Sequence, residues 1–278
     1  MATPRLASLC LLGADGGPLR VDVRTSARQG EVRPTVVVCH GFKGFKDWGF
    51  FPRLGERLAL AGFTAVTFNF SGSGVGSCEG VVDEPDRWFR QTLSNDLADL
   101  DAVLAHLAGS GEPPWLALLG HSRGGGIAVL QAGRDRRVRA LVTWAAVSSF
   151  LRYSPEEVVA WRRDGRIQVA NARTGQVLPV GTALLDDLDL NGAGSLDLIA
   201  AAGRVRVPWL IVHGRADETV PVSEAERLLE ASGSPLAALR LVQRAGHTFG
   251  ARHPWAGSTR ELDQAIGWTA EFLGQALG

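Results

Sequence analysis

The sequence predicts an α/β fold with a mostly parallel central sheet and helices on both of its faces. Short apolar runs alternate along the chain with longer segments whose apolar residues recur at helical spacing. Several of these apolar runs end in glycine and a polar residue, as strands do at the edge of a parallel sheet. At 278 residues and 45% hydrophobic content, the chain can bury one full core and fits a single domain with an insertion.

The N-terminal region predicts an antiparallel hairpin. Residues 6–12 are mostly apolar, residues 15–18 read Asp-Gly-Gly-Pro as a turn, and residues 19–24 alternate behind it. The apolar run of residues 6–12 superficially resembles a signal peptide, but it is short and no clear cleavage site follows. We therefore interpret it as a strand.

The strands and helices of the main sheet follow from apolar runs and helical periodicity. Strands are expected at residues 36–39, 64–70, 115–120, 140–145, 209–213 and 239–242, and the clearest helices at residues 51–61, 93–107, 223–230 and 261–277. Because helices separate most of these strands, the strands should run parallel.

Residues 148–206 are the exception to this alternation. The composition there is loop-like, and no strand of the main sheet is expected within it. We expect a core of residues 1–147 and 207–278 with a small helical cap formed by residues 148–206. Tyr153 and Trp161 of this cap could line a pocket, although apolar cap residues mostly pack against a core.

The most informative motif is Gly120-His121-Ser122-Arg123-Gly124. It joins an apolar run, residues 115–119, to a helix-like run that begins at Gly126. A strand that turns sharply into a helix presents a serine hydroxyl above the sheet edge, and small residues are needed where the backbones crowd together. The bare pattern is weakly specific, but this context indicates a nucleophile elbow.

Two further strand ends supply what serine chemistry requires. The run at 209–212 leads to Asp217, and the run at 239–242 leads to His247. Serine is a poor nucleophile at neutral pH, so Ser122 needs an imidazole base that a carboxylate orients. His253 and Glu218 are rivals for these roles. We favour His247 over His253 because His247 comes directly after the final strand.

A third strand end predicts an oxyanion site. The run at 35–39 leads to His40-Gly41-Phe42, where backbone N–H groups can turn toward a reacting carbonyl. We expect the backbone N–H groups of Phe42 and Arg123 to donate, the second because it follows Ser122 at a helix N-terminus. Side-chain identity at these two positions should matter little to that role.

Taken together, these motifs resemble the α/β-hydrolase superfamily over nearly the whole chain, from about residue 19 to the C-terminal helix. The resemblance is strongest to the esterase, acyl-peptidase and dienelactone-hydrolase-like branch, through HGFKGFKDW at 40–48, NFSGSG at 69–74, GHSRGG at 120–125 and HGRADETVP at 213–221. The order Ser122, Asp217, His247 is the one that this superfamily shows. The resemblance implies Asp217 rather than Glu218 as the acid and a lid after the sixth strand. Dienelactone hydrolases proper use a cysteine where this chain has Ser122.

Both lysines of the chain, Lys43 and Lys46, fall in the oxyanion-side loop. They are interpreted either as a cationic mouth for a substrate carboxylate or as ordinary solvated charges. Trp48 could form an aromatic wall on the same side, although core packing explains it equally well.

Several classes of function are disfavoured. The formal net charge is zero and no long basic run occurs, so we expect no nucleic-acid partner. The cysteines Cys10, Cys39 and Cys78 are widely spaced, which disfavours a disulfide framework or a cysteine-rich metal site. We expect no metal, no cofactor, no membrane span and a cytoplasmic location, with a homodimer possible. Gly72, Gly74 and Gly76 lack the spacing of a dinucleotide loop.

The sequence thus predicts a serine hydrolase that cleaves a small to medium carboxylic ester through an acyl-enzyme on Ser122. Two alternatives stay open at this point. One is a peptidase or thioesterase of the same fold, and the other is a noncatalytic ligand-binding protein.

Overall fold

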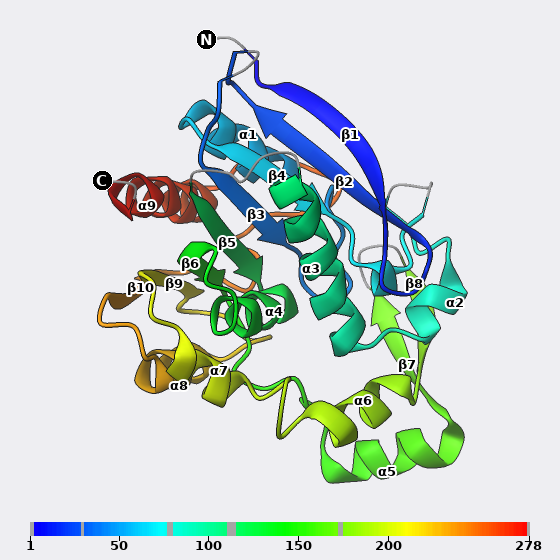
Figure 1. The fold of residues 1–278 in the computed structure, drawn as a ribbon. Helices are drawn as coiled ribbons and strands as arrows, with labels where there is room; N and C mark the ends of the chain where they lie inside the picture. Colours follow the sequence, from blue (N-terminus) through cyan, green and yellow to red (C-terminus); the bar gives the residue numbers. More distant parts are fainter. Residues whose placement is uncertain (1–2, 29–30, 77–79, 110–114, 172–174, 277–278) are drawn as a thin grey trace.

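The computed structural model describes residues 3–28, 31–76, 80–109, 115–171 and 175–276. Cys78 and Leu277 lie outside the described residues. Eight strands form one twisted sheet in the order β1-β2-β4-β3-β5-β6-β9-β10 (Figure 1). Their bounds are β1 Arg5–Leu12, β2 Pro18–Thr25, β3 Thr35–Cys39, β4 Thr64–Phe68, β5 Leu116–His121, β6 Val138–Trp144, β9 Trp209–Gly214 and β10 Ala237–Val242.

The predicted α/β fold is confirmed. β1 pairs antiparallel with β2, and β2 pairs antiparallel with β4, as an N-terminal hairpin requires. All other neighbours in the sheet are parallel, so the strands from β4 to β10 end at one common edge. The loops after β3, β5, β9 and β10 meet at this edge, and they carry Phe42, Ser122, Asp217 and His247 respectively.

Helices cover both faces of the sheet. On one face α1 (Phe51–Leu60) packs against β2 and β4, and α9 (Arg260–Ala276) packs against α1 and the strands β6, β9 and β10. On the other face lie α3 (Leu93–Gly109), α4 (Arg123–Ala132) and α8 (Val222–Ala231). Two short elements precede α3: a 3-10 helix η1 (Ser71–Ser73) and α2 (Pro85–Phe89).

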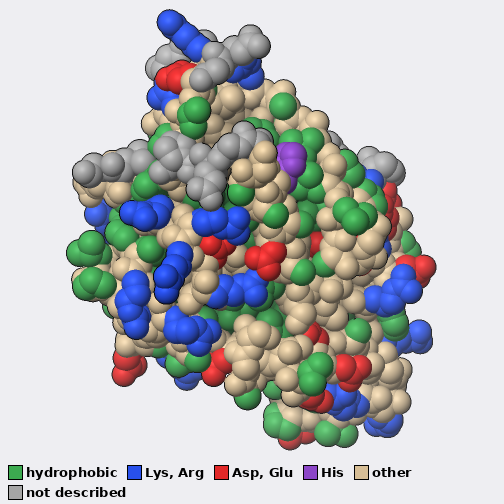
Figure 2. Space-filling model, viewed as in Figure 1, with side chains coloured by type: hydrophobic (Ala, Val, Ile, Leu, Met, Phe, Trp, Pro, Cys, Tyr) green, Lys and Arg blue, Asp and Glu red, His purple; other side chains and the backbone are tan. Residues whose placement is uncertain are grey.

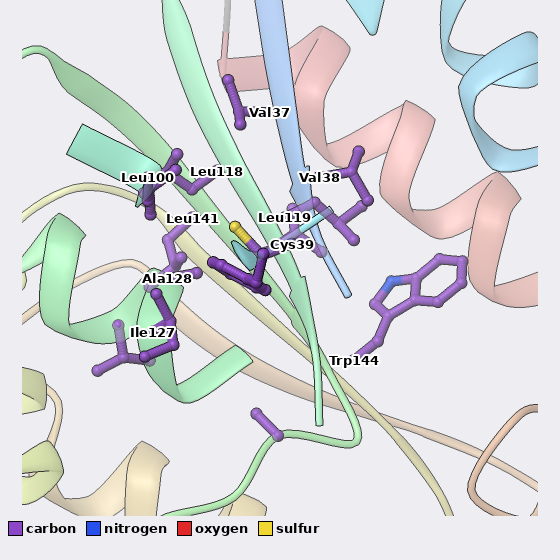
Figure 3. Close-up of a cluster of buried hydrophobic side chains, with 14 of the residues drawn as sticks. Val37, Val38, Cys39, Leu100, Leu118, Leu119, Ile127, Ala128, Leu141 and Trp144 are labelled. Carbon is purple, nitrogen blue, oxygen red and sulfur yellow. The ribbon is translucent and has the colours of Figure 1, made fainter. Parts of the chain in front are cut away.

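The central strands are buried on both sides, as their continuous apolar runs predict. All six residues of β5 are buried. Figure 3 shows Ile127 and Ala128 of α4 on one side of these strands and Trp144 on the other. The indole nitrogen of Trp144 donates to Thr269 Oγ1 of α9 at 3.0 Å, so its polar atom is satisfied within the core.

The segment 148–206 is more than the small helical cap that was expected. It contains α5 (Pro155–Asp164), α6 (Ala183–Asn191) and α7 (Leu198–Arg204), but also an antiparallel hairpin of β7 (Arg166–Asn171) and β8 (Gln176–Gly181). Alternation explains the hairpin, because Val169 faces inward while its neighbours are exposed. α7 packs against α4 and α8. Figure 1 shows α5 and α6 at the lower end of the view, with β7 and β8 extending from them toward α2.

Charged side chains of both signs share the surface. Lys and Arg side chains gather on the left of the face shown in Figure 2, with acidic side chains among them. Ion pairs on the surface include Arg134 with Asp101 and Arg137 with Asp135. Among the described residues, no helix is both long and apolar enough to cross a membrane.

Candidate functional site

A cavity of about 750 Å³ lies between the carboxyl edge of the sheet and the insertion. The core contributes Ser122 and His247 to its lining, and the strand β7 contributes the continuous stretch from Ile167 to Asn171. The remaining lining residues are Phe42, Lys43, Leu93, Arg123, Val147, Phe150, Arg152, Tyr153, Glu157, Leu184, Thr219, Val220 and Thr248. A cavity of this size accommodates a small to medium organic molecule.

Ser122 occupies the sharp turn between β5 and α4. Its backbone has φ 56° and ψ −121°, a conformation that L-residues rarely adopt. Glycine two residues before and two residues after Ser122 makes the turn possible. A Cβ on Gly120 would lie 2.3 Å from the carbonyl oxygen of Gly124, and a Cβ on Gly124 would lie 2.2 Å from that of His40. The motif is therefore a structural elbow, as its context predicted.

Three side chains from three separate loops are joined by two consecutive hydrogen bonds. His247 Nε2 lies 3.1 Å from Ser122 Oγ, and His247 Nδ1 lies 2.8 Å from Asp217 Oδ2. Asp217 follows β9 and His247 follows β10, so adjacent parallel strands bring the two together. An imidazole held in this way can accept the serine proton on one nitrogen while the carboxylate orients the other.

Asp217 is held in its charged form. Burial acts to raise the pKa of Asp217, but the hydrogen bond and charge of His247 outweigh it, and the pKa lies below its ordinary value. The other carboxylate oxygen, Oδ1, accepts from the backbone N–H groups of Thr219 and Val220, each at 2.9 Å. The side chain of Asp217 is fully buried, whereas Glu218 is exposed. The structure thus brings Asp217, and not its rival, to His247.

Two other histidines, His213 and His253, each form a hydrogen bond with a backbone group. His213 is buried and donates through Nε2 to the carbonyl of Val220 at 2.8 Å; burial lowers the pKa of His213, which favours a neutral ring. The rival His253 lies elsewhere. Its Nδ1 accepts from the backbone N–H of Gly49 at 3.1 Å, and its ring stacks on Trp48.

The two expected oxyanion donors lie on either side of Ser122. Arg123 is the first residue of α4, where a backbone N–H has no acceptor within the helix. Phe42 follows Gly41, and a Cβ on Gly41 would lie 2.9 Å from Ser122 Cβ, so the loop after β3 passes close to the elbow. Phe42, Ser122 and Arg123 all line the cavity. This arrangement can place two N–H groups near a carbonyl that Ser122 attacks.

Of the four side chains expected to bind substrate, Lys43 and Tyr153 line the cavity. Lys43 Nζ donates to the carbonyl of Ala170 in β7 at 3.2 Å and so connects the oxyanion-side loop to the insertion. Lys46 differs. Its ammonium pairs with Asp22 and Asp47, and only 12% of its side chain is exposed. Neither of the two interpretations, a cationic mouth or an ordinary solvated charge, therefore describes Lys46.

Trp48 and Trp161 are not among the described residues that line the cavity, so their assignment as substrate-binding residues is corrected. The ring of Trp48 is buried, edge-on to Phe50 and stacked on His253, beneath the first helix. Trp161 is buried within the insertion, where its ring meets Tyr153 edge-on at 5.1 Å. Both act in packing because large aromatic surfaces are most favourably removed from water.

Sequence reasoning missed most of the residues that the insertion contributes, among them Gln168 and Asn171 of β7 and Arg152 at the start of the insertion. Alternation of Ile167 and Val169 was the only available signal for this strand. The described residues contain no group of three or more histidine, cysteine, aspartate or glutamate side chains placed to hold a metal ion.

Fold and strand order define an α/β-hydrolase, and comparison with known families agrees. A model of the family described as serine aminopeptidase, S33, matches residues 30–172, just over half of the chain. The chain therefore belongs to this family of α/β-hydrolases. The matched region includes Ser122 but ends before Asp217 and His247. No curated protein sequence matches the chain.

Solved structures share the fold at low sequence identity. Est1E from Butyrivibrio proteoclasticus, determined with ferulic acid bound, superposes with a TM-score of 0.74 at 18% identity, covering 97% of this chain and 99% of that one. A dienelactone hydrolase from Anabaena variabilis gives 0.66 at 16% identity, with 99% of each chain covered. A cold-adapted esterase from an Arctic intertidal metagenomic library gives 0.63 at 15% identity, with 98% and 95% covered.

Proposed function

We propose that the protein is a serine hydrolase that cleaves a small to medium carboxylic ester through an acyl-enzyme on Ser122. The observation that carries this proposal is the hydrogen-bonded line from Ser122 Oγ through His247 to Asp217, with distances of 3.1 and 2.8 Å. It opens into a cavity that a small ester can fill.

In this mechanism His247 accepts the proton of Ser122 while Oγ attacks the ester carbonyl. The negative charge that develops on the carbonyl oxygen is stabilised by the backbone N–H groups of Phe42 and Arg123. His247 then gives its proton to the departing alcohol, and the acyl group stays on Ser122. Water, deprotonated by His247, attacks the acyl-enzyme and releases the acid, which restores Ser122. Asp217 holds the imidazole in the required tautomer throughout.

The cavity supports an ester with an aromatic or compact apolar group. Phe42, Phe150 and Tyr153 supply aromatic surface, while Ile167 and Leu184 of the insertion supply aliphatic surface. Est1E, which has the same fold, has been observed with ferulic acid, an aromatic acid. We propose that the insertion of residues 148–206 acts as the lid over this pocket.

An aminopeptidase is the second candidate, because the family carries that description. Binding the free amine of a peptide requires a negative charge in the pocket. Glu157 is the single acidic side chain among the described lining residues, and its carboxylate accepts from the backbone N–H of Ser154 in a helix cap. Lys43, Arg123 and Arg152 line the same cavity. Arg123 pairs with Asp96 and Arg152 with Glu224, so what disfavours a peptide amine is that the carboxylate of Glu157 is already engaged in the helix cap.

Kinetics with chromogenic substrates test the proposal. A panel of nitrophenyl esters of increasing acyl size, with aryl esters included, is compared with aminoacyl nitroanilides. We expect turnover of short and aryl esters by the wild-type protein and none by Ser122→Ala. A higher kcat/KM for the aminoacyl anilides would favour the aminopeptidase. Absence of turnover on every substrate, in folded protein, would contradict both.

A further inference from the structure

We propose that the side chain of Arg123 is a positioning residue that clamps the Phe42 loop to α4 and thereby fixes the two oxyanion donors relative to each other. This inference rests on the proposed hydrolase function, because it concerns how the oxyanion site is held. It assigns a role to a side chain whose identity is not expected, from the sequence alone, to matter to the oxyanion site.

The first half of the clamp joins the two donor residues directly. The guanidinium carbon of Arg123 lies 4.9 Å from the centroid of the Phe42 ring, within the range of a cation–π contact. Phe42 belongs to the loop after β3, and Arg123 begins α4, so this contact links two elements that are distant in the chain. The Phe42 ring also stacks on Trp88 of α2, with centroids 5.2 Å apart and planes at 15°.

The second half anchors the guanidinium to buried polar groups. Arg123 donates through Nη1 to Gln91 Oε1 at 2.7 Å, and Gln91 in turn donates through Nε2 to the carbonyl of Trp88 at 2.8 Å. Gln91 is almost completely buried. Contacts therefore form a closed ring from Arg123 through Phe42, Trp88 and Gln91 and back to Arg123.

The carboxyl group of Asp96 in α3 also lies against the guanidinium. Arg123 Nη2 lies 3.1 Å from Asp96 Oδ2, whose side chain is completely buried. The contact is an ion pair by distance, since neither carboxylate oxygen of Asp96 has a hydrogen bond of good geometry. Burial raises the pKa of Asp96 to about 7, against the opposing charge of Arg123. Arg123 is thus the cation that offsets the burial of this carboxyl group.

Only arginine can make all of these contacts together. A planar guanidinium can lie over a ring while its edge donates to Gln91 and approaches Asp96, whereas a lysine ammonium offers neither a face nor a fork. Oxyanion donors act by being fixed before the reaction begins, so slack between Phe42 and Arg123 would weaken stabilisation of the transition state more than substrate binding.

The test compares Arg123→Met and Arg123→Lys with a matched control, Arg134→Met. Arg134 lies just beyond α4 and pairs with Asp101 of α3, so it reproduces an arginine–aspartate link between the same helices but away from the cavity. kcat and KM are measured on a nitrophenyl ester, with active sites counted by fluorophosphonate titration. Affinity for a boronic acid, which forms a tetrahedral adduct with serine, is measured beside them.

We expect kcat per titrated site to fall about tenfold or more in Arg123→Met, with KM within about twofold of the wild type. Affinity for the boronic acid should fall in parallel. Arg123→Lys should recover little of the loss, and Arg134→Met should match the wild type. A merely structural role would lower the number of titrated sites and leave kcat per site unchanged.

If Arg123→Met does not fold because Asp96 is left unpaired, the double variant Arg123→Met/Asp96→Asn removes both charges and gives the same comparison. Wild-type kcat per site in a folded Arg123 variant would overturn the clamp and leave the hydrolase proposal intact. Lack of ester turnover and of probe labelling in the wild-type protein would instead overturn the hydrolase proposal, and the clamp with it.

Discussion

His121 Nε2 lies 2.9 Å from the backbone carbonyl oxygen of His247, so the residue before the elbow serine holds the loop that carries the candidate base. Their rings lie 4.8 Å apart. Because Asp217 bonds the imidazole of His247 from the other side, both the backbone and the ring of His247 are fixed relative to Ser122. The site is therefore assembled before any substrate enters, which is what electrostatic and general-base catalysis require.

His247→Ala should abolish ester turnover, because it removes the imidazole whose Nε2 lies 3.1 Å from Ser122 Oγ. His253→Ala is the matched control. It removes a packing contact with Trp48 and the acceptor for Gly49 N–H, so it should cost about 1 kcal/mol of stability and leave kcat almost unchanged. Steady-state kinetics and thermal unfolding of both variants distinguish these effects. Loss of ester turnover in His253→Ala, with turnover retained in His247→Ala, would reverse the assignment of the base.

Asp217→Asn should lower kcat by roughly 10³–10⁴. The asparagine oxygen is needed by the backbone N–H groups of Thr219 and Val220, so its NH₂ group would face His247 Nδ1. That arrangement makes Nδ1 the acceptor and places the ring proton on Nε2. Nε2 then cannot accept the proton of Ser122. Single-turnover acylation measures the effect. Glu218→Gln should show wild-type acylation, and a large loss in Glu218→Gln instead would overturn the assignment of the acid.

The two lysines should differ when each is replaced by methionine. Lys46→Met leaves Asp22 without its nearest ammonium, so we expect a loss of about 1–3 kcal/mol in the free energy of unfolding with unchanged KM. Lys43→Met removes a cation from the cavity lining and should raise KM for acidic esters by roughly fivefold relative to neutral ones, equivalent to ~1 kcal/mol. Equal KM ratios in Lys43→Met and wild type would exclude a carboxylate-recognition role.

The contribution of His40 to the free energy of unfolding should fall as the pH is lowered from about 7 to 5. Burial lowers the pKa of His40 to about 4, and its ring accepts from the backbone N–H of Phe70 at 3.0 Å. The unfolded chain takes up this proton near pH 6.5, so the stabilisation is complete above that pH and is lost as the pH falls toward 4. At ~1.4 kcal/mol per pKa unit, His40 contributes a few kcal/mol.

Denaturant titrations at pH 7.5 and 5 measure this dependence, with His40→Gln as the comparison. The variant should be less stable at neutral pH but lose less stability on acidification. Because His213 is also buried with a lowered pKa, part of the pH dependence of the free energy of unfolding should remain in His40→Gln. Identical slopes for His40→Gln and wild type would show that His40 does not carry the effect.

The central strands of the main sheet could be predicted from the sequence because they are buried on both faces and their composition records this directly. Ser122, Asp217 and His247 could be predicted to meet because parallel strands end at one edge, so position along each strand was sufficient. The hairpin β7–β8 could not be predicted, because its strands are short and half exposed and depend on packing against α2 and α5.

The surroundings of individual side chains also could not be predicted from the sequence. Trp48 and Trp161 have the residue type of a binding wall, but only tertiary packing decides whether an aromatic ring faces a cavity or a core. The ring of contacts among Arg123, Phe42, Trp88 and Gln91 joins three separate segments, and no local pattern in the sequence records it.

The most direct test of the central claim is to treat the purified protein with a fluorophosphonate probe and locate the modified residue by mass spectrometry. We expect a single stoichiometric adduct on Ser122, formed rapidly in the wild type and very slowly in His247→Ala, because the imidazole activates the serine hydroxyl. An adduct on another residue, or no adduct in folded protein that also leaves nitrophenyl esters intact, would contradict a serine hydrolase acting through Ser122.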